Sequence, residues 1–299
     1  MWACGTIIYQ LLGGYKPFQH ENIEGLFRKI RAADYCFHDE NWQNISVESK
    51  RLIHGMLAVD PRVRLSVEEA LDSTWMKIDD DVTQSLSSTD LSVSLKKLRS
   101  QQVITKFKSA VHAVSYLTNA KCWATNFVSF MDQDSTVSSS IQRHPKIGKL
   151  FNEIYDIRTM IQKGNTSTVW RGINIKSNLA FAIKVVDRSS PTCPVEDLQT
   201  LNEVAILRSL ASDRLDGDSQ VVPLLDFFEE DHRFCLVMEL VAGGDLFERI
   251  VKRTKYTEEC ARNLTRGLCR AVAFIHSRRI AHRDLKPQNL LLVVRIVYI

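Results

Sequence analysis

One short segment near the end of the chain brings together several side chains that can do chemistry. Residues 282–289 read His-Arg-Asp-Leu-Lys-Pro-Gln-Asn. In this spacing Asp284 can take or orient the proton of an attacking hydroxyl group, and Lys286 can neutralise a phosphoryl group in transfer. Asn289 offers an amide oxygen to Mg²⁺. The pattern therefore predicts phosphoryl transfer, with Asp284, Lys286 and Asn289 as catalytic residues and Asn289 as the metal ligand.

The same segment resembles the catalytic loop of the protein kinases, and the resemblance extends over residues 155–292. The Ala-Ile-Lys tripeptide that ends at Lys184 is similar to the strand whose lysine contacts the α- and β-phosphates of ATP, and Glu203 is placed to pair with it. Taken alone, Lys184 would be interpreted as a solvated strand lysine. The resemblance, with Lys286 in the loop, implies an ATP- and Mg²⁺-dependent serine/threonine protein kinase with protein substrates.

Residues 236–247 read Leu-Val-Met-Glu-Leu-Val-Ala-Gly-Gly-Asp-Leu-Phe and resemble the hinge of the calcium/calmodulin-dependent kinase group. The resemblance implies that Met238 is the gatekeeper and that the backbone of Glu239 and Leu240 faces the adenine edge. It places Asp245 near the ribose. Without the resemblance, the composition indicates only a buried strand that runs into a Gly-Gly turn.

The loop expected to cover the phosphates departs most from the family pattern. Residues 162–169 align with G-x-G-x-x-G-x-V, but only Gly164 of the three glycines is present, and Gln162 stands at the first position. Glycine serves there because the backbone must turn tightly and bring its N–H groups close to phosphate oxygens. The ATP-contacting residues that the resemblance implies are Ile161, Gly164, Val169, Ala182, Lys184, Glu203, Met238, Glu239, Leu240 and Asp245.

The first 76 residues read as helices separated by tight loops, without a strand signal. Apolar spacing predicts helices over 5–12, 23–31 and 46–57, the last with Ser46 as its N-cap. Ser66 and the glutamate three residues later predict a capping box that opens a fourth helix. The segment resembles the end of the C-terminal lobe in the same kinase group, where an arginine at the position of Arg64 pairs with the glutamate of an A-P-E motif.

The stretch 77–154 is expected to be a linker that contains a regulatory helix. Residues 77–92 are acidic and rich in Ser and Thr, whereas 91–117 form a basic amphipathic pattern with Leu91, Leu95 and Leu98 on one face. The resemblance places an autoinhibitory, calmodulin-binding helix here, and a calmodulin groove accepts such helices. Calmodulin is therefore a predicted partner through 91–117. The alternative is a helix that packs on its own lobe or lies on a surface.

The whole pattern predicts an α+β protein of the kinase type in an unusual order. Residues 1–76 are the expected end of a C-terminal lobe, and 155–299 are the expected β-rich N-terminal lobe, hinge and catalytic loop, truncated before a D-F-G motif. Two arrangements fit: a window from tandem kinase domains, or a permuted kinase in which 1–76 pack beneath the later part. A fragment without D-F-G is expected to have little activity by itself. A non-catalytic, pseudokinase-like or calmodulin-binding regulatory module is the alternative function.

Bulk composition limits the expected partners and compartment. A net charge of +4 is too small to indicate a nucleic-acid or membrane partner. Seven cysteines without a C-x-x-C pair favour reduced thiols and a cytoplasmic or nuclear location. The start lacks the basic segment of a secretory signal. The apolar stretch 290–299 is far shorter than the roughly 20 residues that cross a bilayer, so a buried strand is expected there.

Overall fold

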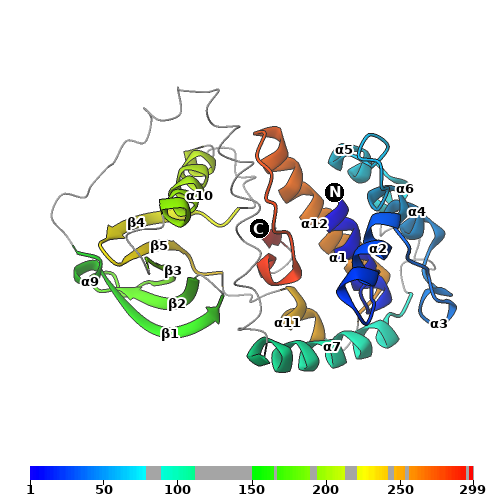
Figure 1. The fold of residues 1–299 in the computed structure, drawn as a ribbon, viewed down its shortest axis with the longest axis horizontal. Coiled ribbons are helices and arrows are strands. Elements are labelled where there is room, and N and C mark those ends of the chain that lie inside the picture. Colours follow the sequence, from blue (N-terminus) through cyan, green and yellow to red (C-terminus); the bar gives the residue numbers. More distant parts are fainter. Residues whose placement is uncertain are drawn as a thin grey trace. The chain divides into compact units, whose positions relative to one another are not determined.

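The chain forms two compact units. The computed structural model describes residues 1–78, 89–111, 150–164, 167–188, 194–212, 221–241, 246–252, 256–293 and 296–298. The first unit joins Met1–Lys106 to Ala242–Ile299, and the second comprises Phe107–Val241. Both ends of the chain therefore belong to the same unit (Figure 1).

The second unit is built on a five-stranded antiparallel sheet with the order β1-β2-β3-β5-β4. Strands that follow each other in sequence pair as β1 with β2, β2 with β3 and β4 with β5. The β3–β5 pair joins these two parts into one open sheet. A short helix, α9 (Phe151–Ile154), precedes it, and Phe151 is buried with Ile183 and Val237. The strands are β1 (Tyr155–Lys163), β2 (Ser167–Asn174), β3 (Ala180–Asp187), β4 (Leu224–Glu230) and β5 (Arg233–Glu239).

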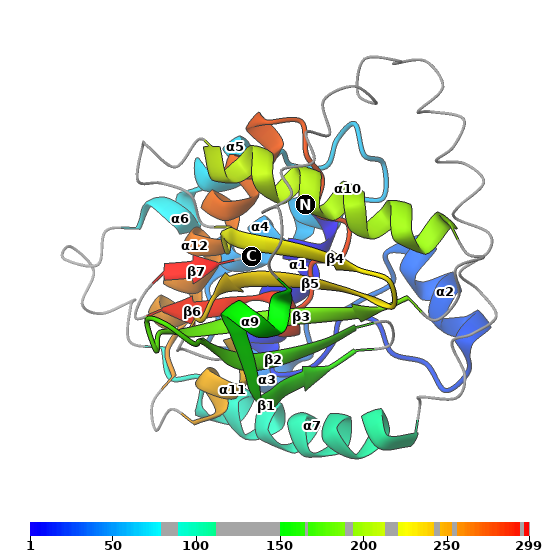
Figure 2. The same cartoon turned by 90° about the vertical axis from the view of Figure 1, so that its left-hand side faces the viewer.

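One long helix, α10 (Pro194–Ser212), packs against the β4 side of this sheet (Figure 2). Val204 from the helix is buried with Leu224, Phe234 and Leu236 from the strands. Because Glu203 directly precedes Val204, the burial of Val204 also fixes the rotation of α10 at Glu203.

The early part of the first unit consists of helices whose caps match the sequence pattern. The side chain of Ser46 accepts a hydrogen bond from the Ser49 N–H, and Ser66 and Glu69 form a complete capping box. Gly14 ends the first helix in the left-handed conformation, with φ of 80°. These helices are α1 (Trp2–Gly13), α2 (Ile23–Ala32), α3 (Asp39–Trp42), α4 (Val47–Met56), α5 (Val67–Leu71) and α6 (Thr74–Lys77).

The late part of the first unit supplies two helices and the loop that carries the catalytic motif. Thr257 caps α12 by accepting a hydrogen bond from the Cys260 N–H. The N–H of Leu246 donates to the carbonyl of Leu290 at 2.8 Å, which connects the start of α11 to the end of the loop. The elements are α11 (Leu246–Val251), α12 (Glu258–Ser277), the 3₁₀ helix η4 (Pro287–Asn289) and an antiparallel hairpin of β6 (Leu291–Val293) and β7 (Ile296–Tyr298).

These early and late parts share one hydrophobic core. Ile8 of α1 and Ile53 of α4 are buried in the same cluster as Leu268 of α12. The carboxylate of Glu258, also buried, accepts hydrogen bonds from the indole N–H of Trp75 at 2.7 Å and from the hydroxyl and N–H of Ser46. Residues 1–76 therefore pack with the described part of 242–299, a point that the sequence left open.

The helix α7 (Ser92–Val111) begins on the surface of the first unit. Leu91, Leu95 and Leu98 are buried in the shared core, as their common face predicts. The hydroxyl of Ser94 donates to the carbonyl of Leu12 at 2.6 Å. The start of α7 is therefore held to the lobe by both apolar and polar contacts. Residues 112–117 of the predicted helix lie outside the described part of the chain.

The α+β fold class is confirmed, but two strands and the exposure of one helix differ from what the sequence pattern predicts. Residues 169–172, 180–186 and 234–239 show the short alternating runs that predict strands, and they lie within β2, β3 and β5. The sequence pattern does not single out β1 and β4. Most of β1 is exposed, and β4 reads as apolar pairs followed by acidic residues, so neither shows a clear period of two. In α2, Ile23 and Phe27 are 69% and 51% exposed although they share the predicted apolar face.

Candidate active site

The predicted catalytic residues lie together in the loop after α12. The ammonium of Lys286 lies 2.7 Å from Oδ2 of Asp284, and the amide nitrogen of Asn289 donates to the same oxygen at 2.9 Å. Asn289 also donates to the backbone carbonyl of Asp284 at 2.8 Å. The side chains of Asp284 and Lys286 are 64% and 47% exposed, so a hydroxyl group from solvent can reach the carboxylate.

The backbone of this loop turns sharply to bring the three side chains together. Arg283 adopts a left-handed conformation with φ of 64°. The N–H of Asp284 donates to the carbonyl of His282 at 2.9 Å, and the imidazole of the half-buried His282 lies within 3.3 Å of the same N–H. Pro287 then starts η4, where its missing N–H costs nothing, and the buried Leu290 anchors the exit.

The predicted lysine–glutamate pair is present in the second unit. Nζ of Lys184 donates to both carboxylate oxygens of Glu203, at 2.6 and 2.9 Å. Lys184 lies in β3 between Val169 of β2 and Leu236 of β5, so two strands support its position. The side chains are 23% and 42% exposed, which leaves the ammonium accessible to an anionic ligand.

The predicted hinge and adenine-contacting residues lie at the end of β5. Ala182 of β3 is directly opposite Met238 across the strand pair. Glu239 ends the strand with an exposed side chain, and Leu240 follows it, half-buried. Asp245 lies outside the described residues. The arrangement provides an apolar pair, Ala182 and Met238, next to a stretch of backbone that leaves the sheet.

The predicted phosphate-covering loop is the turn between β1 and β2. Gln162 pairs with Val169 across this hairpin, and the N–H of Gly164 donates to the carbonyl of Ser167 at 2.8 Å. Ile161 is 51% exposed. The hairpin therefore forms with one glycine, and a glutamine side chain stands where the family pattern has the first glycine.

Arg188, which also links β3 to α10, was missed by motif reasoning. It directly follows β3, and its guanidinium donates to Oδ2 of Asp197 in α10 at 2.6 and 2.9 Å. The only sequence signal was a basic residue shortly after Lys184 and an acidic one shortly before Glu203. That signal is too common to indicate a contact by itself.

The predicted residues thus form two groups, one in each compact unit. Lys184, Glu203 and the hairpin and hinge residues belong to the second unit, whereas Asp284, Lys286 and Asn289 belong to the first. Within each group the charged side chains are in direct contact. The group around Lys184 has the form of an anion-binding site. The group around Asp284 has the form of a general base beside a cation.

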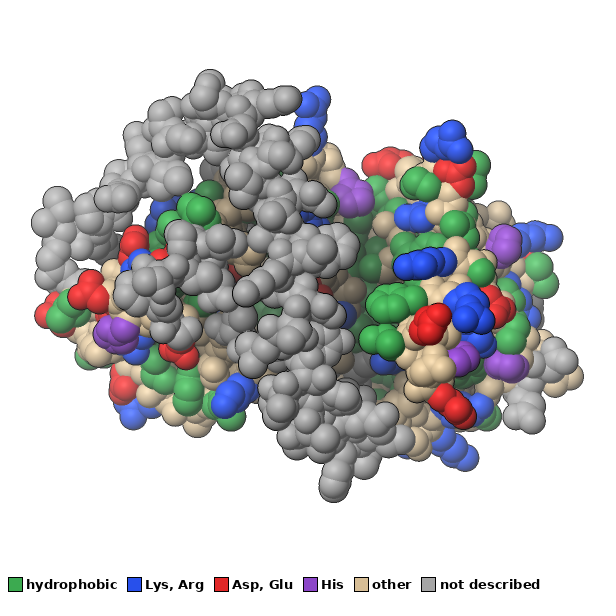
Figure 3. Space-filling view, viewed as in Figure 1, with side chains coloured by type: hydrophobic (Ala, Val, Ile, Leu, Met, Phe, Trp, Pro, Cys, Tyr) green, Lys and Arg blue, Asp and Glu red, His purple; other side chains and the backbone are tan. Residues whose placement is uncertain are grey.

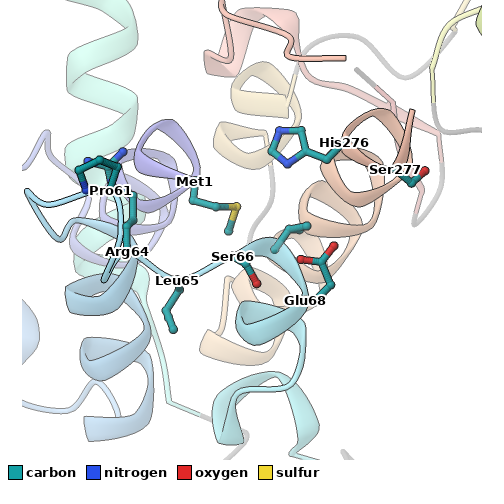
Figure 4. A pocket seen from close by; sticks show the side chains of 9 residues that line it. Met1, Pro61, Arg64, Leu65, Ser66, Glu68, His276 and Ser277 are labelled. Carbon is teal, nitrogen blue, oxygen red and sulfur yellow. The ribbon is translucent and has the colours of Figure 1, made fainter. Parts of the chain in front are cut away.

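A cavity of about 370 Å³ lies elsewhere in the first unit, between the start of α1, the loop before α5 and the end of α12 (Figure 4). The guanidinium of Arg64 donates to the carbonyls of Ala58 and Val59 at 2.8 and 2.9 Å and lies over the ring of Trp2. None of the predicted catalytic or ATP-contacting residues is among the described residues that line it. These are Met1, Pro61, Arg64, Leu65, Ser66, Val67, Glu68, His276 and Ser277.

The clearest pKa shifts lie outside both groups and come from burial. Burial raises the pKa of Cys4 and of Cys235 to about 11, and it raises the pKa of Tyr35 to about 12. Burial lowers the pKa of His276. A thiol with a raised pKa is a poor nucleophile, so these cysteines are core residues.

Metal donors are sparse in the part of the chain that the structure describes. No three His, Cys, Asp or Glu side chains there could together hold a metal ion. Asp284 and Asn289 remain as oxygen donors, which suits Mg²⁺ because that ion is held by few protein ligands plus phosphate oxygens and water.

Acidic and basic side chains are interspersed on the visible face of the first unit (Figure 3). Among the described helices, none has the length and apolar character to cross a bilayer.

Comparison with known families agrees with the motif reading. The family model described as protein kinase domain matches residues 1–76 and 155–297, well over half of the chain. The chain belongs to the protein kinase family. The match continues beyond residue 292, where the motif resemblance ended, into the β6–β7 hairpin.

Relatives of the chain include a protein named as a calcium/calmodulin-dependent kinase. The chain is 38% identical over 149 residues to calcium/calmodulin-dependent protein kinase type 1 of Caenorhabditis elegans, an alignment that covers 49% of this chain and 40% of the relative. It is 36% identical over 140 residues to myosin light chain kinase A of Dictyostelium discoideum, covering 47% and 45%. It is 34% identical over 139 residues to the probable serine/threonine-protein kinase fhkC of that organism, covering 46% and 22%. The chain spans less than half the length of these relatives.

Proposed function

We propose that this chain carries the nucleotide-binding and catalytic groups of a serine/threonine protein kinase similar to the calcium/calmodulin-dependent kinases. The observation that supports this most is the pair of charge clusters, Lys184 with Glu203 and Asp284 with Lys286 and Asn289. Either cluster alone could be a structural ion pair. Both together, in a chain of the protein kinase family, favour phosphoryl transfer to protein hydroxyl groups.

Each charged side chain has a separate proposed role. Asp284 orients the substrate hydroxyl and takes its proton as the oxygen attacks phosphorus. Lys286 neutralises negative charge on the phosphoryl group in transfer. Lys184, oriented by Glu203, binds the α- and β-phosphates. Phosphoryl transfer depends mainly on positioning and charge neutralisation, and these are the tasks that such contacts perform.

Mg²⁺-ATP is the proposed cofactor. The amide nitrogen of Asn289 is occupied by Asp284, so its oxygen is the atom left to bind the ion. When bound there, Mg²⁺ would offset the negative charge of the phosphates. The adenine would lie between the apolar side chains of Ile161, Val169, Ala182 and Met238, beside the backbone of Glu239 and Leu240, with Gly164 over the phosphates and Asp245 near the ribose.

We further propose that the C-terminal lobe is assembled from two pieces in permuted order. The shared core of 1–78 and 242–299 supports this, as do the contacts of Glu258 with Ser46 and Trp75. If the chain were part of two tandem kinase domains, residues 1–76 and 242–299 would belong to different lobes and would not be expected to share one core. In the permuted arrangement the residues around Asp284 gain the hydrophobic support of α1 and α4.

Nucleotide binding is the first test of the proposed function. Titration of the purified chain with a fluorescent ATP analogue and Mg²⁺ is expected to show saturable binding. Lys184→Met is expected to weaken this binding by about tenfold or more, since one hydrogen bond to a charged group contributes about 1.5–3 kcal/mol. Arg158→Met, which breaks an exposed pair with Asp156, is the matched control and is expected to bind normally. Equal binding by wild type and Lys184→Met would count against the assignment.

Phosphoryl transfer is the second test. We expect slow phosphorylation of a serine peptide, because the 299 residues contain no D-F-G motif after Asn289. Asp284→Asn is expected to abolish the activity while leaving nucleotide binding intact, since it removes the base but keeps the shape. Turnover that survives this substitution would place the catalytic base elsewhere.

A calmodulin-binding regulatory module is the second candidate function. The basic amphipathic character of 91–117 and the names of several relatives favour it. Leu95 and Leu98 are buried against the first unit, so calmodulin would have to displace α7 to reach them. A peptide of residues 91–117 is expected to bind calmodulin with Ca²⁺ and to release it with a chelator, and Leu95→Asp is expected to weaken the complex. Calmodulin binding by a chain that binds no nucleotide would select the non-catalytic alternative.

A further inference from the structure

The side chain of Arg188 lies where three elements of the second unit meet. Its guanidinium donates to Oδ2 of Asp197 on α10 at 2.6 and 2.9 Å, and to the carbonyl of Glu230 at the end of β4 at 3.0 Å. The carboxylate of Glu229 lies 3.6 Å away. The guanidinium also lies over the ring of Phe234 on β5, 4.6 Å from its centre. One cation therefore connects β3, α10 and the β4–β5 hairpin.

This junction is more enclosed than an ordinary surface ion pair. The side chains of Arg188 and Asp197 are 23% and 25% exposed, compared with 56% and 44% for the pair of Arg158 and Asp156 on β1. Phe234, beneath the guanidinium, is buried in the apolar cluster that packs α10 on the sheet. Two nitrogens of the planar guanidinium donate to the same oxygen, Oδ2 of Asp197, and such a rigid group loses less freedom per bond than a lysine side chain would. The contact can therefore hold α10 in one position.

Two ion pairs thus connect the same strand and helix. On β3, Lys184 precedes Arg188 by about 13 Å of extended chain, and on α10, Asp197 precedes Glu203 by about 9 Å of helix. If α10 slid or rotated about its axis, both pairs would change together. The Arg188–Asp197 pair lies at the start of the helix, where it can act as a fixed point for the Lys184–Glu203 pair further along.

We propose that Arg188 and Asp197 are positioning residues for nucleotide binding. They hold α10 so that Glu203 reaches Lys184 and directs its ammonium toward the phosphates. Neither residue touches the nucleotide in this scheme. The inference rests on the proposed ATP-binding role of Lys184, and it adds a second anchor to which no kinase motif of this chain points.

A thermodynamic cycle of nucleotide affinities tests the proposal. Arg188→Met is expected to weaken binding of a fluorescent ATP analogue by about three- to tenfold, whereas Arg158→Met changes it by less than about twofold. In a Glu203→Gln background, Arg188→Met should cause little further loss, because the interaction that it supports is already broken. Losses that multiply in the double variant, or unchanged binding by Arg188→Met, would overturn the proposal.

Two further measurements separate positioning from general damage. The charge-swapped pair of Arg188→Asp with Asp197→Arg is expected to recover affinity relative to Arg188→Asp alone, and failure to recover would count against a specific pair. If Arg188→Met does not fold, Arg188→Lys replaces it in the cycle, with a smaller expected loss.

If the wild type binds no nucleotide, the proposed function fails, and hydrogen exchange decides the role of Arg188 alone. Amides around Glu203 are then expected to exchange faster in Arg188→Met than in Arg158→Met. Equal exchange rates would refute the anchoring role.

Discussion

At the scale of single residues, Glu258 links the two separate stretches of the first unit. Its carboxylate is buried and accepts hydrogen bonds from Trp75 and Ser46, which lie far earlier in the chain. Arg262, one turn further along α12, is also buried and lies over the same indole ring. A buried carboxylate is tolerated only when hydrogen bonds replace its lost water, and here the donors come from the early helices.

Replacing Glu258 by alanine is expected to destabilise the fold by about 2–4 kcal/mol, since three donors, the indole N–H of Trp75 and the hydroxyl and N–H of Ser46, would lose their acceptor. Urea unfolding monitored by tryptophan fluorescence measures the change. The control is Glu259→Ala at the next position, which is half-exposed and is expected to cost less than about 0.5 kcal/mol. Similar costs at the two positions would argue that the contacts of Glu258 contribute little.

Burial of His276 predicts a pH dependence of stability. Its pKa in the folded chain is lowered, so the unfolded chain binds the proton more tightly. The stabilising contribution is therefore complete above the unfolded pKa of about 6.5 and declines as the pH falls through that value. We expect His276→Gln to lose less stability than the wild type between pH 7 and pH 5. A stability profile for His276→Gln that falls with pH as steeply as that of the wild type would contradict this assignment.

At the scale of elements, the docking of α7 depends on a close approach of two backbones. A Cβ atom on Gly14 would lie 2.6 Å from the carbonyl oxygen of Ser94 and 2.7 Å from its Cα. Gly14 also has a positive φ, which costs a non-glycine residue about 1–2 kcal/mol. Gly14 therefore both ends α1 and allows the backbone of α7 to approach closely at Ser94.

Gly14→Ala is expected to loosen α7 from the first unit by steric exclusion as well as by strain. Hydrogen exchange over residues 92–101 should rise by about tenfold or more, while α12 stays protected. Ser100→Ala, on the exposed side of α7, serves as the control. If the proposed calmodulin site is real, the Gly14 variant should also bind calmodulin more tightly, because less free energy is needed to free the helix. Unchanged exchange of α7 would show that the lobe can accommodate the methyl group.

The other elements show how packing decides what periodicity leaves open. The pattern of α2 predicted a helix, and the structure has one, but Ile23 and Phe27 face outward. The same kind of pattern in α7 placed Leu95 and Leu98 in the core. A period of 3.6 defines a stripe on a helix but does not say whether another element covers it.

At the scale of the whole chain, the order of the elements along the sequence differs from their order in space. The early helices α1 and α4 complete the core around α12, although more than two hundred residues separate Ile8 from Leu268. Such a core makes the two stretches mutually dependent, because each exposes a large apolar face without the other.

A cut in the connection should therefore leave the two pieces associated. A protease recognition sequence inserted after residue 130 would give fragments 1–130 and 131–299 on cleavage. We expect them to elute together in native gel filtration and to separate in urea, since the shared core is held by burial rather than by the peptide bond. Ile8→Asp, which places a charge in that core, should release the fragments. Separate elution of the wild-type pieces would favour independent domains.

The sequence alone predicted the candidate catalytic loop and most of the local structure. Asp284, Lys286 and Asn289 lie within one short loop, so their spacing is sufficient to predict that they meet. The caps at Ser46 and Ser66 depend on residues three positions away and are equally readable. Local geometry is predictable because the chain between the partners has little freedom.

Only the tertiary structure decided which distant segments share a core and which side chains support the ion pairs. The sequence could not choose between tandem domains and one permuted lobe, because both arrangements present the same helical faces. Nor could it find Arg188, whose partners come from a helix and a hairpin that meet only after folding. Contacts of that kind depend on how apolar surfaces close against one another, a property of the packed chain rather than of any local pattern.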